Sequence, residues 1–76
     1  MTQDQMISRL NTKFPNSQVE VHDLTGTEDH WEVHISSSLF QGLTRIQQHK
    51  LVMNTFDAEL KTGEVHALTM KTKELK

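Results

Sequence analysis

The sequence contains no cysteine and no tyrosine, a single proline, and no long apolar run. Because cysteine is absent, the chain cannot form a disulfide, use a thiol nucleophile, fold around a cysteine-ligated zinc ion or hold an iron–sulfur cluster through its own thiolates. The longest apolar run covers residues 51–53, far short of the roughly 20 residues that cross a membrane. The first residues also lack the basic and apolar segments of a signal peptide, so we expect a cytoplasmic protein outside the membrane.

Apolar residues are scarce as well. They make up 34% of the 76 positions, and adding the three glycines still leaves the share below the usual value of about 45–50%. Because apolar burial must offset the conformational entropy lost on folding, we expect one small domain over residues 1–76 with a lean core. Such a domain favours a scaffold that acts with a partner over an enzyme with a deep active site.

Basic residues are missing from one part of the chain. No Lys or Arg occurs between Lys13 and Arg45, and the acidic residues of that segment are Glu20, Asp23, Glu28, Asp29 and Glu32. The formal net charge of the chain is −2 at pH 7, so the remaining segments carry an excess of positive charge. A nucleic-acid surface would have to avoid the segment 14–44, since carboxylates repel phosphates.

A helix is predicted near the start of the chain. Thr2 and Gln5 have the spacing of a capping box, and apolar residues follow at helical spacing. Pro15 ends the segment, because the residue before a proline disfavours the α region. We therefore predict a helix over residues 3–14.

A second capping box, Thr44 with Gln47, opens a longer helix that ends at Gly63, a typical C′ residue. A short helical turn at residues 39–40 precedes it, and Gly42 breaks that turn. The spacing predicts that one stripe of the longer helix faces the core. This stripe consists of Ile46, His49, Met53, Phe56 and Leu60.

Two segments alternate between apolar and polar residues, as half-buried strands do. They flank the turn-rich segment 25–29, so we predict a β-hairpin centred on Thr27. Opposite charges then face each other on its exposed side, which favours this pairing. The predicted partners are Val19 with Ile35, Val21 with Val33, Glu20 with His34, and His22 with Glu32.

A third strand is predicted from Val65 to about Thr72, and the tail over residues 71–76 is expected to be polar and frayed. Because a strand–helix–strand crossover joins parallel neighbours in a right-handed sense, the third strand should run parallel to the second. The order predicts a small α+β domain with a three-stranded mixed sheet covered by helices on one face.

Five histidines are unusual in 76 residues. Parallel strands begin at the same edge of a sheet, so the predicted topology brings His30 and His66 together beside the loop 25–29. Two imidazoles at such a rim are half of a metal site. The alternative is structural, with His30 merely ending the hairpin and His66 capping a strand.

The other histidines favour structural interpretations. His22 and His34 are expected to form surface ion pairs with Glu32 and Glu20, with adventitious zinc binding as the alternative. His49 lies in the apolar stripe, which favours a core or interface histidine over a metal ligand. Trp31 aligns with the apolar positions of its strand and is expected in the core.

Signals for catalysis are weak. The sequence has no glycine-rich phosphate loop and no HExxH motif, and the serines at 36–38 lack a nucleophile-elbow sequence. Glu28 and Asp29 are adjacent in a turn, which suits a solvated tip better than a pair of catalytic carboxylates. We therefore predict that the chain is not an enzyme.

The second half of the chain carries a series of motifs at characteristic separations. They are Phe40-Gln41-Gly42, Ile46, His49-Lys50-Leu51-Val52, Glu59-Leu60 and Val65-His66-Ala67-Leu68. In this order they resemble the BolA family, and the short loop before Trp31 is closest to its compact, IbaG-like branch. The chain departs from the family pattern at Lys50, where an arginine is usual, and at residues 72–74, where Thr-Pro and Trp commonly follow the last strand.

The resemblance implies a KH-like fold of the second type, α-β-β-α-α-β. It also implies a partnership with a monothiol glutaredoxin and its glutathione around a shared [2Fe–2S] cluster, with no cofactor on the isolated chain. The family's C-terminal histidine ligand matches His66. A second ligand comes from the first strand–strand loop, where the cysteine of some members matches Thr27, so His30 is the nearest candidate here. Alone, the chain is expected to be a monomer or weak homodimer.

A role in nucleic-acid binding, as a transcriptional regulator of stress or morphology genes, is the alternative that the resemblance implies. Phosphates would meet Arg45 and Lys50 at the start of the second helix, with Lys71 and Lys73 as additional contacts. The negative net charge and the absence of a Gly-x-x-Gly loop argue against DNA or RNA as the main partner.

Overall fold

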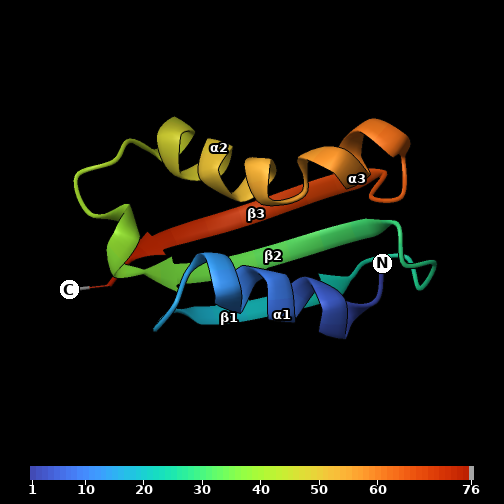
Figure 1. The fold of residues 1–76 in the computed structure, drawn as a ribbon, viewed down its shortest axis with the longest axis horizontal. Helices are drawn as coiled ribbons and strands as arrows, with labels where there is room; N and C mark the ends of the chain where they lie inside the picture. Colours follow the sequence, from blue (N-terminus) through green and yellow to red (C-terminus); the bar gives the residue numbers. More distant parts are fainter. Residues whose placement is uncertain (76) are drawn as a thin grey trace.

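The first helix begins and ends where its sequence signals predict. The computed structural model describes residues 1–75, and in it α1 spans Gln3–Lys13 (Figure 1). The Thr2 hydroxyl accepts from the backbone N–H of Gln5 at 3.2 Å, and the Gln5 side chain accepts from the backbone N–H of Thr2 at 2.9 Å. The reciprocal capping box therefore forms as predicted, and the helix stops one residue earlier than expected, at the Phe14 cap before Pro15.

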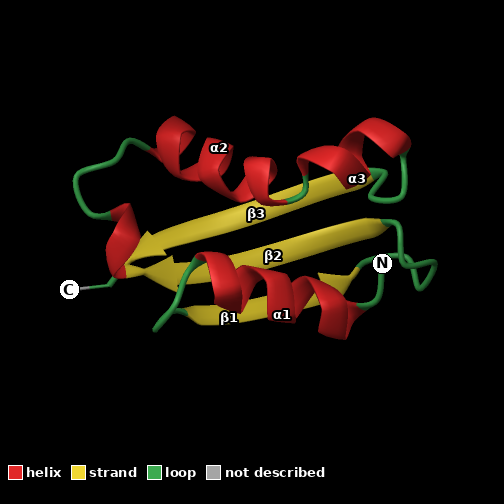
Figure 2. Cartoon of the chain, in the orientation of Figure 1, coloured by secondary structure: helices red, strands yellow, loops and turns green. Residues whose placement is uncertain are grey.

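The sheet has the predicted mixed topology. Strands β1 (Gln18–Asp23), β2 (His30–Ser37) and β3 (Ala67–Glu74) lie in the order β1-β2-β3, with β1 antiparallel and β3 parallel to β2. The hairpin register is the predicted one, which puts Val21 opposite Val33 and Glu20 opposite His34. The helices lie on one face of the sheet, and the other face is open (Figure 2).

The third strand starts two residues later than predicted. Val65 is fully buried, and its backbone N–H donates to the Glu59 carbonyl at 3.1 Å. This contact holds Val65 in the connection from the preceding helix, so the pairing with β2 begins only at Ala67.

The end of the third strand is also more ordered than predicted. The expected frayed tail is wrong for residues 71–75, because β3 continues to Glu74 and pairs there with Ser37. The Leu75 N–H then donates to the Ser37 carbonyl at 3.1 Å, and the Gln41 side-chain amide donates to the Leu75 carbonyl at 2.6 Å. Lys76, the last residue of that predicted tail, lies outside the described residues.

The single long helix of the prediction is two helices, α2 (Arg45–Thr55) and α3 (Asp57–Thr62), after a short 3-10 turn, η1 (Ser38–Phe40). The predicted apolar stripe is wrong for its first half, since Ile46 is 69% exposed and Met53 is 45% exposed. The buried side of α2 consists of Gln48, Val52 and Thr55.

A polar residue on the buried side explains this error. The Gln48 side chain donates to the Leu43 carbonyl at 3.0 Å and accepts from the Thr72 hydroxyl at 2.6 Å, so it is buried with its amide satisfied. An argument based on apolar spacing cannot recognise such a residue as part of the core.

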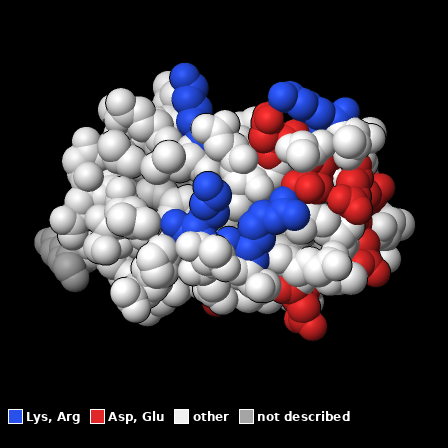
Figure 3. Space-filling view, in the orientation of Figure 1, with Lys and Arg blue, Asp and Glu red and all other residues white. Residues whose placement is uncertain are grey.

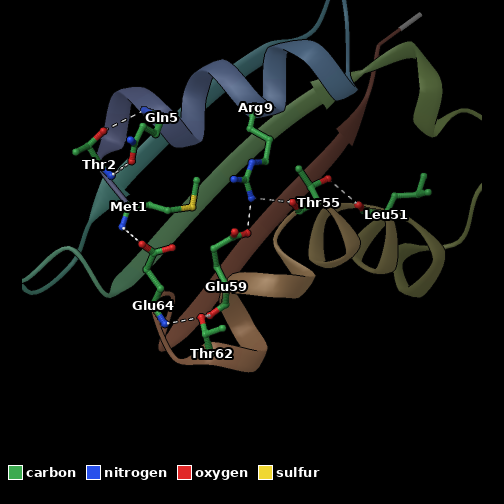
Figure 4. Close-up of polar contacts among 9 residues, drawn as sticks. All are labelled: Met1, Thr2, Gln5, Arg9, Leu51, Thr55, Glu59, Thr62 and Glu64. Atoms are coloured by element: carbon green, nitrogen blue, oxygen red, sulfur yellow. Dashed lines mark hydrogen bonds and ion pairs between the residues drawn. The ribbon is translucent and has the colours of Figure 1, made fainter.

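One arginine of α1, Arg9, joins this helix to α2 and α3 (Figure 4). The Arg9 guanidinium donates to the Thr55 carbonyl at 3.3 Å, forms an ion pair with Glu59, and lies 5.6 Å from the centre of the Phe56 ring. The guanidinium also lowers the pKa of the Glu59 carboxyl. This contact closes the helical layer over the core, whose buried apolar residues are Met6, Leu10, Phe14, Val21, Trp31, Val33, Ile35, Phe40, Val52, Phe56 and Val65. None of the helices in residues 1–75 combines the length and apolarity that a membrane span requires.

Candidate functional site

The starts of β2 and β3 form a rim at one end of the sheet. His30 is the first residue of β2, and His66 immediately precedes β3, so the parallel pairing brings the two side by side. The centres of their rings are 5.1 Å apart, with 49° between the ring planes. The His66 side chain is exposed and the His30 side chain is 37% exposed, so both can be reached from outside.

Asp29 contacts both members of this histidine pair. Its carboxylate oxygen Oδ1 lies 2.8 Å from Nδ1 of the His30 ring. Its backbone carbonyl accepts from the N–H groups of His66 at 2.7 Å and Ala67 at 3.1 Å. The residue predicted as part of a solvated tip is therefore the junction between the loop, β2 and β3.

The Asp29 carboxyl is held in its ionised form. Its pKa is lowered from 3.8 to about 2, chiefly because the Thr27 hydroxyl donates to it and next because His30 does. The Thr25 hydroxyl lies within 3.4 Å of the same oxygen. Two loop hydroxyls thus orient the carboxylate that contacts the His30 ring.

A second aspartate shapes the backbone of the same loop. The Asp23 carboxylate accepts from the N–H groups of Thr25 at 3.3 Å, Gly26 at 3.0 Å and Glu28 at 3.1 Å. Gly26 (φ 76°) and Glu28 (φ 59°) have left-handed conformations within this turn. The loop therefore presents Asp29 and His30 in a defined arrangement, built by its own polar residues.

Comparison with known proteins identifies the family of the chain. The family model described as "BolA-like protein" matches residues 8–76. The chain belongs to the BolA-like family.

Individual BolA-like proteins agree with this assignment in both sequence and fold. The protein RP812 of Rickettsia prowazekii is 40% identical over 63 residues, which cover 83% of this chain and 80% of RP812. BolA1 from Arabidopsis thaliana has a TM-score of 0.84 at 28% identity, over 95% of this chain and 89% of BolA1. The BolA domain of SufE1 from Arabidopsis thaliana has a TM-score of 0.83 at 28% identity, over 95% and 90% of the two chains.

The open face of the BolA-like sheet carries the second histidine pair. The rings of His22 and His34 are 5.5 Å apart, and Glu20 lies between them, 3.5 Å from His22 Nε2 and 3.8 Å from His34 Nδ1. Glu32 lies 3.4 Å from His34 Nε2. The predicted contact of His34 with Glu20 is therefore present, whereas the predicted pairing of His22 with Glu32 is wrong, because His22 contacts Glu20 of its own strand. Within residues 1–75, no group of three or more metal-ligand side chains is placed to hold an ion.

The two remaining aromatic predictions have different outcomes in this BolA-like fold. Trp31 is confirmed as a core residue at 1% exposure. His49 is half-buried at the edge of α2 rather than in the core, and it lines a hollow of about 370 Å³ together with Arg45, Met70 and Lys71. It therefore faces a shallow surface feature between α2 and β3.

The basic residues proposed for phosphate contacts are only partly brought together. Arg45 and Lys71 line the same hollow, and Lys71 shares a second one, of about 320 Å³, with Lys73. Lys50 is exposed on α2 and lines neither. On the helical face of the BolA-like chain, acidic side chains gather toward the rim and α3, away from the end that carries η1 (Figure 3).

Asp29 is the site residue whose role sequence reasoning missed. Its signal was an aspartate directly before a candidate ligand, with Thr25 and Thr27 four and two residues earlier. Aspartate and threonine side chains commonly form such local hydrogen bonds in turns. The contact of its carbonyl with His66 depends on the pairing of β3, which the local sequence does not show.

Proposed function

We propose that this BolA-like chain is a non-catalytic cytoplasmic adaptor that shares a [2Fe–2S] cluster with a monothiol glutaredoxin and its glutathione. His66 is the principal ligand, and His30 is the second. The observation that carries the proposal is the exposed contact between the two rings at the rim, with 5.1 Å between their centres.

The donor set of the rim fits a shared cluster. Two imidazoles are enough for one iron of a [2Fe–2S] cluster, as in histidine-ligated clusters where two histidines replace two cysteines. The chain has no cysteine, so the other ligands must be thiolates from the partner and its glutathione. Imidazole in place of thiolate raises the reduction potential and makes the ligand sensitive to protonation, which suits transfer of the cluster or sensing of iron.

The decisive variant is His66→Ala. We expect it to abolish the change in the visible spectrum when the chain is added to the cluster-loaded glutaredoxin, and to weaken the complex at least tenfold. His34→Ala is the matched control, because it removes a histidine from the other pair, and it should leave spectrum and affinity intact. An unchanged spectrum and affinity for His66→Ala would overturn the proposal.

Binding of nucleic acid through the α2–β3 hollow is the second candidate function. It is favoured by the shared lining of Arg45 and Lys71, with Lys73 adjacent. So few phosphate contacts imply weak binding that salt removes. Submicromolar, sequence-dependent binding of duplex DNA by the isolated chain near physiological salt would place this function first.

A further inference from the structure

Asp29 acts on the two rim histidines through different groups. Its carboxylate lies 2.8 Å from His30 Nδ1, whereas its carbonyl accepts the backbone N–H of His66 at 2.7 Å. One residue thus fixes a side chain at the start of β2 and the backbone at the start of β3. Any change in its position would alter the separation of the two rings.

We infer that Asp29 is a positioning residue that holds the neutral His30 ring with its proton on Nδ1 and its lone pair on Nε2. The inference rests on the proposed function in one respect, since it assigns Nε2 of His30 as the atom that ligates iron. The placement of the proton itself depends only on the contact between Asp29 and His30.

Hydrogen-bond chemistry determines which nitrogen carries the proton. An ionised carboxylate only accepts hydrogen bonds, so the His30 nitrogen that faces Asp29 must be the donor. A neutral imidazole has one N–H, and Nε2 is therefore left with the lone pair that a metal requires. An unconstrained neutral histidine favours the opposite tautomer, with the proton on Nε2, so the contact selects the less common form.

The Asp29 carboxylate is itself held in place by hydrogen bonds, so it can favour one tautomer of His30. The Thr27 hydroxyl donates to the same Asp29 oxygen, and the Thr25 hydroxyl lies 3.4 Å from it. Metal-binding histidines commonly donate their second nitrogen to a carboxylate, which orients the ring and increases its basicity. Asp29 and His30 have this arrangement.

The test combines two variants of Asp29 with a neighbouring control. Asp29→Ala removes the acceptor, Asp29→Asn keeps an acceptor oxygen of the same size without the charge, and Glu28→Gln removes a charge one residue away. The tautomer of His30 is read from the imidazole nitrogen chemical shifts of the isolated, metal-free chain at a pH where the ring is neutral. Backbone amide spectra establish that each variant is folded.

We expect the proton on Nδ1 in the parent chain and in Glu28→Gln, a shift to Nε2 in Asp29→Ala, and partial retention of Nδ1–H in Asp29→Asn. With the cluster-loaded glutaredoxin, Asp29→Ala should weaken cluster binding by about tenfold, the lower end of the effect of such supporting carboxylates, and Asp29→Asn by less. A parent chain with its proton on Nε2, or an Asp29→Ala variant with an unchanged tautomer, would overturn the inference.

The outcomes separate this inference from the proposed function. If Asp29→Ala shifts the tautomer while His66→Ala leaves the cluster complex unchanged, the positioning role stands and the cluster function fails. If His66→Ala abolishes the complex while Asp29→Ala shifts the tautomer without weakening it, the assignment of His30 Nε2 as an iron ligand is wrong.

Discussion

Two histidine pairs lie on the same small sheet, and their rings are almost equally far apart. The centres of the His30 and His66 rings at the rim are separated by 5.1 Å, and those of His22 and His34 on the open face by 5.5 Å. The pairs differ in what their nitrogens contact. On the open face carboxylate oxygens lie 3.8 Å and 3.4 Å from the two nitrogens of His34 and 3.5 Å from Nε2 of His22, whereas at the rim the Asp29 carboxylate lies within hydrogen-bond distance, 2.8 Å, of Nδ1 of His30.

Two imidazole pairs at similar separations can therefore present their nitrogens in different ways. On the open face, Nε2 of His34 is buried and has no hydrogen-bond partner among the described residues, so this nitrogen is not presented to a partner. A histidine with one nitrogen held by a carboxylate presents the other as a preoriented lone pair. The rim pair also lies where two strands begin, so a partner can approach it without crossing the sheet surface.

The largest expected effect is a loss in the free energy of unfolding, and it comes from the side of β2 that the helices cover. Ile35 is 1% exposed and directly follows His34 in the strand. Ile35→Ala should lower the free energy of unfolding by about 2–5 kcal/mol through lost burial and a residual cavity, and His34→Ala should change it by about 0.5 kcal/mol or less. Urea unfolding curves measure both.

The milder variant Ile35→Val keeps this test usable if the alanine variant is too unstable to study. Its expected cost is about 0.5–1.5 kcal/mol, still above that of His34→Ala. A cost for His34→Ala as large as that for Ile35→Ala would mean that the open-face pair is part of the structural core, and the two pairs could no longer be compared as surface features.

The fold could be predicted from sequence where a local residue pattern determines where a helix starts or how two strands pair. The capping box at Thr2 and the alternation around Val21 and Val33 led to the correct helix start and hairpin register. The buried side of α2 could not be predicted in the same way, because Gln48 is buried through hydrogen bonds to distant segments. The link from Arg9 to Glu59 likewise joins residues far apart in sequence.

The candidate site, like the fold, has one part that could be predicted from sequence and one part that could not. Topology alone predicted that His30 and His66 would meet, because parallel strands begin at one edge. The role of Asp29 required the full loop geometry, since its carboxylate contacts Thr25, Thr27 and His30, and its carbonyl accepts from the backbone at the start of β3. The predicted strand order thus indicated which histidines are neighbours, and only the three-dimensional contacts showed how their nitrogens differ.

A smaller effect is expected for the pKa of the Asp29 carboxyl, which tests whether the loop hydroxyls hold this group at the rim. Its pKa is about 2, below the ordinary value of 3.8. Because the folded value is the lower one, the ionised group stabilises the folded rim above about pH 4, and that contribution is lost as the pH falls through about 2. Thr27→Val removes the main donor and should raise the pKa toward 3.8.

Titration of the Asp29 carboxyl carbon by NMR measures this pKa directly. Thr12→Val is a suitable control, since the Thr12 hydroxyl donates to the Ser8 carbonyl within α1. A midpoint that stays near 2 in Thr27→Val would show that the loop hydroxyl does not hold the carboxylate, and the rim would then be no more preorganised than the open face.

The smallest effect is expected for Glu20→Gln, which weakens the network of the open face itself. The Glu20 side chain is 68% exposed and lies 3.5 Å from His22 Nε2 and 3.8 Å from His34 Nδ1. Exposed pairs of this kind contribute about 0.2–1 kcal/mol, and salt screens them. We expect a loss of less than about 0.5 kcal/mol in the free energy of unfolding measured with urea, decreasing further at high salt.

A loss above about 1.5 kcal/mol for Glu20→Gln that salt does not reduce would exceed what exposed pairs supply. In that case the carboxylates would hold His22 and His34 as a rigid unit, and rigidity would no longer distinguish the rim from the open face.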